Sequence, residues 1–326
     1  MDFSDYKGIY VVGALFDGYI RKFIGEFTGE ARALADKSGE EVSVVLLGSD
    51  LKDDPQSLIA LGADHVYVMD DPLLVHYDGQ AYQKVLVKFF REKKPSTVIF
   101  GATPKGRDLA PRIAADLVCG VTADVTELDI DQDTGLVICS RPAMSGNILA
   151  DIISPDYRPQ VCTVRPGIFR SPAPDASRKG EAVDVKVELE QSDIGTILKE
   201  ILKGEKDEHP IETAKVVVAG GRGFHSKEEW DRLYELSELL GGSVGCSRPI
   251  CELGWEPKSH QIGQTGKGVA PKVYFAFGIS GVMQHMCAVN ADIIIAVNKD
   301  PNAPIMAMAD YAVVADIKEF IPRFID

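Results

Sequence analysis

A chain of 326 residues is long for one domain and comfortable for two, and its 45% apolar and 26% charged residues are those of a folded globular protein. The net charge of −14, without a basic tail, argues against binding to nucleic acid or to anionic lipid. No apolar run approaches the ~20 residues of a membrane-spanning helix, and the first residues fit neither a secretory signal nor a transit peptide. We therefore expect a cytoplasmic protein without membrane insertion.

The cysteines give no sign of a metal or iron–sulfur site. None of the six belongs to a CxxC or CxxH pair, so reduced and mostly buried thiols are the simplest interpretation. Cys246 and Cys251, five residues apart, receive the same interpretation. Redox chemistry in this chain would therefore need an organic cofactor.

The first half of the chain alternates β-branched runs with helical patterns. Strands are expected at residues 9–15, 41–48, 65–69 and 96–103, and helices at residues 21–37, near 56, at 81–93 and from about 106. Alternation at this spacing predicts a parallel sheet with helices on its faces.

The pattern changes at Val121, where strand-like pieces follow one another without helices between them. These pieces lie at residues 121–131, 136–143, 147–153 and 160–167, with a further candidate strand at 184–189. We expect antiparallel strands that extend the first domain.

A charged segment divides the chain. We expect a first domain over residues 1–203, a linker at 204–210 and a second domain over residues 211–326. In the second domain strands are expected at residues 214–221, 243–247, 272–280, 292–298 and 311–316, and helices at 226–240, from 281, near 305 and at the end. This alternation predicts a second doubly wound domain with a five-stranded parallel sheet.

Small, polar or charged residues follow every strand of this second domain. They are Gly220 to Gly223 with Arg222, Ser247 with Arg248 and Pro249, Ser280 with Gly281, Asn298 with Lys299 and Asp300, and Asp316. Open parallel sheets bind ligands beyond the carboxyl ends of their strands, so this convergence predicts a binding site. Ordinary polar turns are the alternative explanation.

The longest loop, residues 247–272, is rich in glycine and proline and is expected to be functional. Its segment from Gly263 to Gly268 can present backbone N–H groups to an anion or a polar ring. Gln261 and Gly268 break the phosphate-binding pattern of ATPases, and Ser226 breaks the GxGxxG dinucleotide pattern.

Ser280 stands where a strand is expected to give way to a helix over residues 281–285. We expect Ser280 to cap this helix and its positive end to face the crevice, as suits a phosphate or a reduced flavin. His285 would follow the first turn, either as a hydrogen-bonded core residue or as a ligand contact.

These residues also carry a family resemblance. The segments SRPICELGW, HQIGQTGKGVAPKVYFAFGISGVMQHM, IIIAVNKDPNAPI and ADYAVVAD resemble the FAD-binding domain of the electron transfer flavoprotein alpha subunit. The resemblance covers residues 214–326, and the first domain is similar chiefly through ATPKGRDLAPRIAADL. It implies two doubly wound α/β domains, an N-terminal nucleotide-hydrolase-like domain with extra strands and a C-terminal FAD-binding domain.

The resemblance also implies a heterodimer with a beta subunit and one FAD on this chain. Such a protein is an electron carrier, not a stand-alone enzyme, and links acyl-CoA or related flavin dehydrogenases to an acceptor such as a ferredoxin or quinone reductase. By position, the implied cofactor contacts are Arg222, Ser247, Gln284, Asn298 and Asp316 on the phosphates, ribityl and adenosine, Arg248 against the flavin ring, Gln261, Ile262, Gly263, Gln264 and Thr265 lining it, Ser280 and Gly281 at the helix start, and His285 at the pyrimidine carbonyl.

Positive potential from Arg248, His285 and the helix end is expected to favour an anionic semiquinone, with no general acid or base needed on this chain. Pro249, Cys251 and residues 141–166 look more like the anaerobic, NADH-linked members. Some of those bifurcate electrons with a second FAD that the beta subunit holds.

Other interpretations remain open at this point. An NAD-binding enzyme of the deoxyhypusine-synthase-like domain type would need a nucleophilic lysine, for which Lys267 and Lys299 are the candidates. A nucleotide-sensing module could instead centre on Lys105, Gly106 and Arg107 in the first domain, although the resemblance implies that this domain binds no nucleotide.

Overall fold

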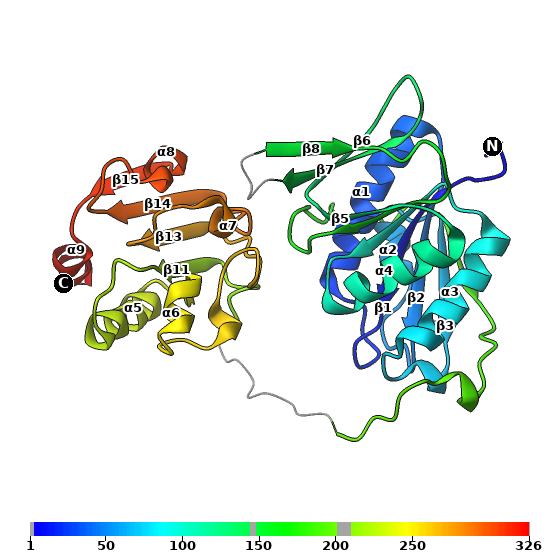
Figure 1. The fold of residues 1–326 in the computed structure, drawn as a ribbon, viewed down its shortest axis with the longest axis horizontal. Helices are drawn as coiled ribbons and strands as arrows, with labels where there is room; N and C mark the ends of the chain where they lie inside the picture. The colour runs from blue at the N-terminus through cyan, green and yellow to red at the C-terminus, as the bar shows by residue number, and fades with distance from the viewer. Residues whose placement is uncertain (1–2, 144–147, 201–209, 326) are drawn as a thin grey trace. The chain divides into compact units, whose positions relative to one another are not determined.

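The computed structural model describes residues 3–143, 148–200 and 210–325 (Figure 1). The described chain divides into two compact units: residues 3–143 and 149–200 form the N-terminal unit, and residues 210–325, together with Ile148, form the C-terminal unit. The predicted linker at 204–210 lies, except for Pro210, outside the described residues. Among the described residues, no helix combines the length and the apolar character needed to cross a membrane.

A seven-stranded sheet forms the centre of the N-terminal unit. Its order is β10 (Glu181–Asp184), β3 (His65–Asp70), β2 (Val42–Gly48), β1 (Ile9–Ala14), β4 (Thr97–Gly101), β9 (Gln160–Val164) and β5 (Val121–Val125). Every neighbouring pair is parallel, with Val11 opposite Val44 in the central pair. The central strands β1 and β2 are buried along almost their whole length, as expected where helices cover both faces of a parallel sheet.

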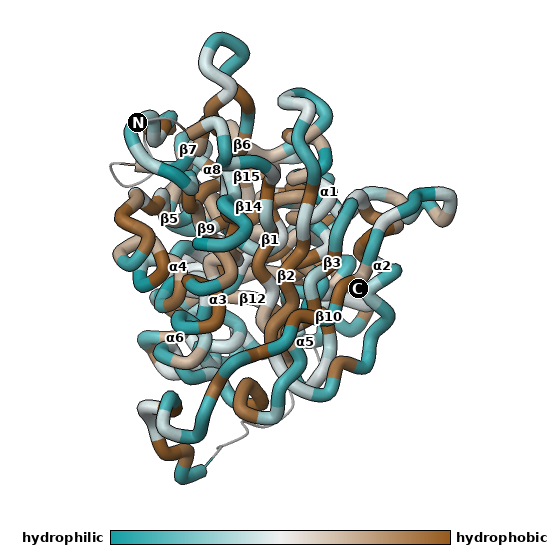
Figure 2. Tube along the Cα trace, turned by 90° about the vertical axis from the view of Figure 1, so that its right-hand side faces the viewer, coloured by the Kyte–Doolittle hydropathy of each residue, from teal (hydrophilic) through white to brown (hydrophobic). Residues whose placement is uncertain are grey.

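The helices of this unit are α1 (Lys22–Ser38), α2 (Gln56–Ala60), α3 (Gly79–Lys93) and α4 (Pro104–Leu117), with the 3-10 turns η1 (Pro72–Leu74) and η3 (Gln191–Asp193). One core cluster gathers on the α1 face of the sheet and another on the α3 and α4 face. Figure 2 shows hydrophobic residues along the central strands and hydrophilic ones along the connecting segments. The predicted parallel α/β domain is confirmed.

The predicted antiparallel extension is only partly correct. β6 (Glu127–Ile130) and β7 (Val137–Ala143) are antiparallel and form a small three-stranded sheet with β8 (Ile148–Ile152). β5 and β9, in contrast, are parallel strands of the main sheet. β9 is buried at every position, as befits an interior parallel strand.

The strand predicted at 184–189 is also misplaced, since the strand ends at Asp184. The Val185 N–H still donates to the Val68 carbonyl of β3 at 2.8 Å, whereas Val187 and Leu189 pack against the core beside α3 outside any strand. Their alternation therefore reflects packing of an extended segment, which a strand pattern cannot distinguish from a paired strand.

The C-terminal unit contains the predicted five-stranded parallel sheet. Its order is β12 (Ser243–Cys246), β11 (Val216–Gly220), β13 (Val273–Phe277), β14 (Ile293–Asn298) and β15 (Tyr311–Val314). The helices are α5 (Lys227–Leu239), α6 (Arg248–Glu252), α7 (Met283–Met286), α8 (Pro304–Met308) and α9 (Ile317–Ile325), with the 3-10 turn η4 (Lys258–His260). The doubly wound assignment of both domains is confirmed.

Ser226 begins α5 with a side-chain cap, in which its Oγ accepts a hydrogen bond of 3.3 Å from the Glu229 N–H. Ser226→Ala is expected to lower the free energy of unfolding of the C-terminal unit by about 1 kcal/mol, because one N–H of the first turn loses its partner. Urea titration followed by tryptophan fluorescence measures this loss, since both tryptophans lie in this unit. Ser226→Asp restores a capping oxygen and should recover most of the loss; an equal loss in both variants would contradict the cap.

Candidate functional site

The carboxyl edge of the C-terminal sheet gathers the predicted strand ends. The chain passes from β11 to β12 on one side and then to β13 on the other, so the order reverses beside β11. Ligand crevices form at such a reversal. All five strands are parallel, and the polar residues that follow them therefore lie along one edge.

Two glycine turns meet at this reversal. The Gly221 N–H donates to the Phe277 carbonyl at 2.9 Å, and the Gly223 N–H donates to the Gly278 carbonyl at 3.0 Å. A Cβ atom on Gly223 would lie 2.7 Å from the Gly278 Cα, so the close approach requires glycine. Arg222 lies between these glycines with an exposed side chain.

The long loop after β12 has a defined structure. It contains α6 and η4, and it then returns to the sheet where the Ile262 N–H donates to the Cys246 carbonyl at 2.8 Å. The Gln264 N–H donates to the Gln284 carbonyl at 2.7 Å. The loop is thereby tied both to the end of β12 and to α7.

The segment from Gln261 to Thr265 is buried over its first three residues and exposed over its last two. Gln261 is buried and its Nε2 donates to Thr265 Oγ1 at 2.9 Å, whereas Gln264 and Thr265 are exposed. Ile262 packs its side chain into the core, so only its backbone can face a ligand. Gly263, at φ +143°, approaches the Gln284 carbonyl so closely that a Cβ atom would lie 2.9 Å from it.

The predicted helix cap at Ser280 is wrong. Gly281 has φ +80°, which an α-helix does not allow, so α7 begins only at Met283 and has a single turn. Ser280 is exposed, and its carbonyl accepts a hydrogen bond of 3.1 Å from the Ile305 N–H. A one-turn helix contributes little dipole, so the positive potential expected from it is largely lost.

His285 is buried on α7. Its Nε2 pairs with the Tyr274 hydroxyl at 2.6 Å, and burial lowers the pKa of His285 to about 4, against an opposing backbone contact with Ile262. The ring is therefore neutral at neutral pH, and the positive charge predicted there is not found. Its Nδ1 is buried without a hydrogen bond of normal geometry.

Arg248 and Ser247 begin the loop. The Arg248 Nε lies 2.8 Å from the Glu252 carboxylate across one turn of α6, and both side chains are exposed. Ser247 precedes α6 without a capping hydrogen bond from its side chain. Both side chains are thus accessible beside the end of β12.

Asn298 and Asp316 have structural partners at the other strand ends. Asn298 is buried, donating from Nδ2 to the Ile279 carbonyl at 2.8 Å and accepting at Oδ1 from the Asp300 N–H at 3.0 Å. Asp316 accepts at Oδ1 from the Lys318 N–H at 3.0 Å, at the start of α9.

The two lysines considered as nucleophiles lie in ordinary surroundings. Lys267 pairs with Glu212 at 2.8 Å, and Lys299 is exposed in a turn. In the N-terminal unit Arg107 pairs with Asp124 at 2.8 Å, and Gly106 sits where a Cβ atom would lie 1.9 Å from the Gly101 carbonyl oxygen. Lys105 lines a mostly apolar cavity of about 310 Å³ at the ends of β1 and β4, and burial lowers its pKa.

Sequence patterns missed two features near the crevice. Tyr274 was expected only as a strand residue, yet its hydroxyl fixes the His285 ring. Glu256, in the middle of the long loop, is a buried carboxylate. A tyrosine within a buried strand and an acid beside a tryptophan are the only signals that the sequence carries for them.

Comparisons with known proteins agree with this architecture. Residues 15–190 match the electron transfer flavoprotein domain, and residues 210–290 match the electron transfer flavoprotein FAD-binding domain. The chain is 47% identical to the electron transfer flavoprotein subunit alpha of Megasphaera elsdenii, over 99% of this chain and 96% of that protein. It is 45% identical to Protein FixB of Clostridium saccharobutylicum, over 100% of this chain and 97% of that protein. The chain belongs to the electron transfer flavoprotein alpha-subunit family.

Proposed function

We propose that this chain is the alpha subunit of a heterodimeric electron transfer flavoprotein and holds one FAD in the C-terminal domain, residues 211–326. The observation that carries the proposal is the convergence of polar residues at the carboxyl edge of the parallel sheet, where Arg222, Arg248 and Ser280 follow three different strands and are exposed. The Nδ1 of the buried His285 lacks a hydrogen bond of normal geometry, and a flavin pyrimidine carbonyl that reached it would accept from it. FAD supplies the redox chemistry, taking up and releasing electrons singly or in pairs.

Each side chain has a role that its position permits. Arg222 and Arg248 are exposed cations that suit the phosphates and the flavin ring. Thr265 accepts from Gln261, which leaves its hydroxyl proton available to the ring. Asn298 and Asp316 would contact the ligand with the side-chain polar groups that their own turn hydrogen bonds do not use.

The roles of Ser247, Gln284, Ser280 and Gly281 remain those that the family resemblance implies. Ser247 and Gln284 would contact the phosphate, ribityl or adenosine parts, and Ser280 and Gly281 would line the crevice with backbone atoms. Gln261, Ile262, Gly263 and Gln264 would face the ring, Ile262 through its backbone alone.

The proposed electron path runs from acyl-CoA or related flavin dehydrogenases to a ferredoxin or quinone reductase. Co-expression with the beta subunit, followed by flavin analysis and an anaerobic redox titration, tests this function. One FAD that remains with Arg248→Lys but dissociates more readily in Arg248→Ala supports it. A colourless wild-type heterodimer overturns it.

The NADH-linked variant of this function needs a second FAD on the beta subunit. Its support is the similarity of residues 141–166 to the anaerobic members. Two FAD per heterodimer together with NADH oxidation would support bifurcation, whereas a single FAD without NADH oxidation would exclude it.

The N-terminal unit, residues 1–203 in the proposed division, would contact the beta subunit. β8 lies at an edge of its three-stranded sheet and exposes apolar residues, with Ile148 53% and Leu149 50% exposed, and Ile153, directly after the strand, is 45% exposed. An exposed apolar edge is normally covered by a partner. We therefore assign β8 to the heterodimer interface.

Leu149→Asp is expected to raise the dissociation constant of the heterodimer about tenfold, because a charge replaces apolar surface in the interface. Calorimetric titration of the two separately purified subunits measures this change. Val75→Asp is the matched control, since Val75 is a similarly exposed apolar residue outside β8. Equal dissociation constants for both variants would remove β8 from the interface.

A further inference from the structure

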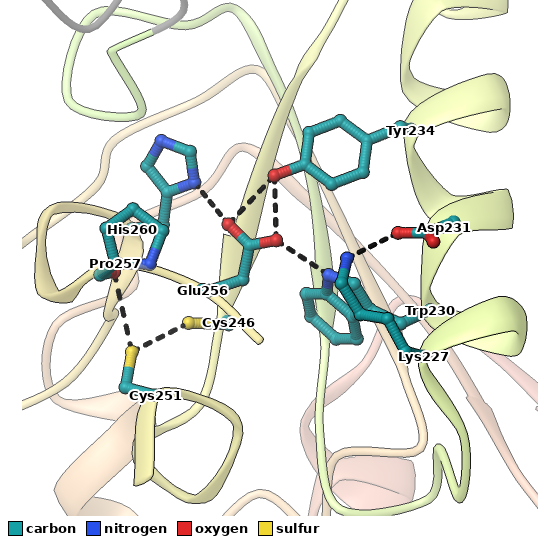
Figure 3. A network of polar contacts seen from close by, with 9 residues as sticks. All are labelled: Lys227, Trp230, Asp231, Tyr234, Cys246, Cys251, Glu256, Pro257 and His260. Carbon is teal, nitrogen blue, oxygen red and sulfur yellow. Dashed lines mark hydrogen bonds and ion pairs between the residues drawn. The ribbon is translucent and has the colours of Figure 1, made fainter. Parts of the chain in front are cut away.

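Glu256 is a buried carboxylate that none of the proposed roles uses. Its side chain is 1% exposed, and it lies in the long loop between α6 and η4. Trp230 Nε1 donates to it at 2.7 Å, the Tyr234 hydroxyl donates at 2.7 Å, and His260 Nδ1 lies 2.7 Å from it (Figure 3). One carboxylate thus joins α5 to two points of the loop.

This carboxylate carries its charge despite its burial. Burial alone would raise the pKa of Glu256, but the hydrogen bonds from His260, Tyr234 and Trp230 outweigh burial and hold the pKa below its usual value. The pKa of Tyr234 is raised by burial and by its bond to Glu256, so its hydroxyl remains a donor. Glu256 is therefore an ionised acceptor at neutral pH, and such bonds are directional and strong.

The network adjoins the predicted ring-lining segment. His260, held by Glu256, directly precedes Gln261, whose side chain donates to Thr265. These contacts link α5 to the residue directly before the Gln261–Thr265 segment. The same segment is fixed at its other side by the bond between the Gln264 N–H and the Gln284 carbonyl.

The network also reaches the helix that carries Arg248. Cys251 of α6 places its Sγ 3.2 Å from Cys246 Sγ and 3.5 Å from the Pro257 carbonyl, next to Glu256 in the chain (Figure 3). The segments before and after Glu256, α6 and Gln261–Thr265, both contain proposed flavin contacts. Both are therefore connected to α5 through the part of the loop that contains Glu256.

We propose that Glu256 is a positioning residue of the flavin site, which fixes α6 and the Gln261–Thr265 segment onto α5 through Trp230, Tyr234 and His260. The inference rests on the proposed function. A role in general stability would require only apolar packing, which Trp230 already supplies against Phe224 and Trp255. A directional network beside the site instead restrains the geometry of the segments that contact the ligand.

The test uses the heterodimer with Glu256→Gln, which keeps the side-chain size but turns an acceptor toward its donors into an NH2 group. We expect the dissociation constant for FAD to rise at least about tenfold and the circular dichroism of the bound flavin to change. Tyr234→Phe removes one donor only and should shift both readouts in the same direction by less. If Glu256→Gln does not fold, Tyr234→Phe decides the question.

Ile321→Val is the matched control, because Ile321 is buried in the same core on α9 and lies outside the loop. It should lower the melting temperature while leaving the FAD affinity and the flavin spectrum unchanged. If Glu256→Gln and Tyr234→Phe behave like this control, the positioning role is overturned. A wild-type heterodimer without FAD would instead overturn the proposed function itself.

Discussion

Gly281→Ala is expected to lower the free energy of unfolding of the C-terminal unit by about 3 kcal/mol and to release most of the FAD, because the new methyl group both strains the backbone and contacts α8 too closely. The backbone at Gly281 has φ +80°, which disfavours any side chain. In addition, the Cβ atom would lie 2.5 Å from the backbone nitrogen of Ile305, which donates to the Ser280 carbonyl. The turn after β13 and the start of α8 would have to separate.

Gly241→Ala separates these two causes. Gly241 has φ +61° in the same unit, but a Cβ atom there meets no atom within 4 Å. Its cost should therefore be the conformational part alone, about 1 kcal/mol. Urea titrations of both variants give the two losses, and flavin absorbance gives the FAD retained. Equal losses would show that α8 moves freely away from the turn and would contradict the close contact.

Much of the fold could be predicted from local patterns. The C-terminal strands alternate with helices, and their apolar runs end in polar residues, so the element order and the polar edge follow from the sequence. Strand partners are tertiary information, and this is why β5 and β9 were assigned to an antiparallel extension although they belong to the parallel sheet. The sequence of β9, QVCTV, does not indicate which strand lies beside it.

The site shows the same division. The residues after the strands could be predicted because their position depends only on strand direction. The cap at Ser280 could not, because the left-handed backbone of Gly281 depends on its contact with α8. Glu256 was missed because a lone acid in a polar loop normally lies in solvent, and two of its three donors, Trp230 and Tyr234, lie on α5.

His285 is expected to make the C-terminal unit less stable in acid. Burial lowers the pKa of His285 from 6.5 to about 4. Between these pH values His285 is therefore protonated in the unfolded chain and neutral in the folded chain. The stability due to the neutral ring is complete above the unfolded pKa and is lost as the pH falls toward 4. The full loss corresponds to about 3 kcal/mol.

Urea unfolding of the flavin-free wild type and of His285→Gln, between pH 4.5 and 7.5, measures the pH-dependent stability that His285 contributes. Glutamine can still accept from Tyr274 but does not titrate in this range. The wild type should therefore lose unfolding free energy as the pH falls while the variant does not, so that the difference in unfolding free energy between the two proteins narrows toward low pH. Parallel profiles would mean that the histidine titrates normally and is accessible to water. A narrowing difference would instead show that the folded chain holds His285 uncharged, which leaves exposed cations such as Arg222 and Arg248 to supply positive potential at the carboxyl edge of the sheet.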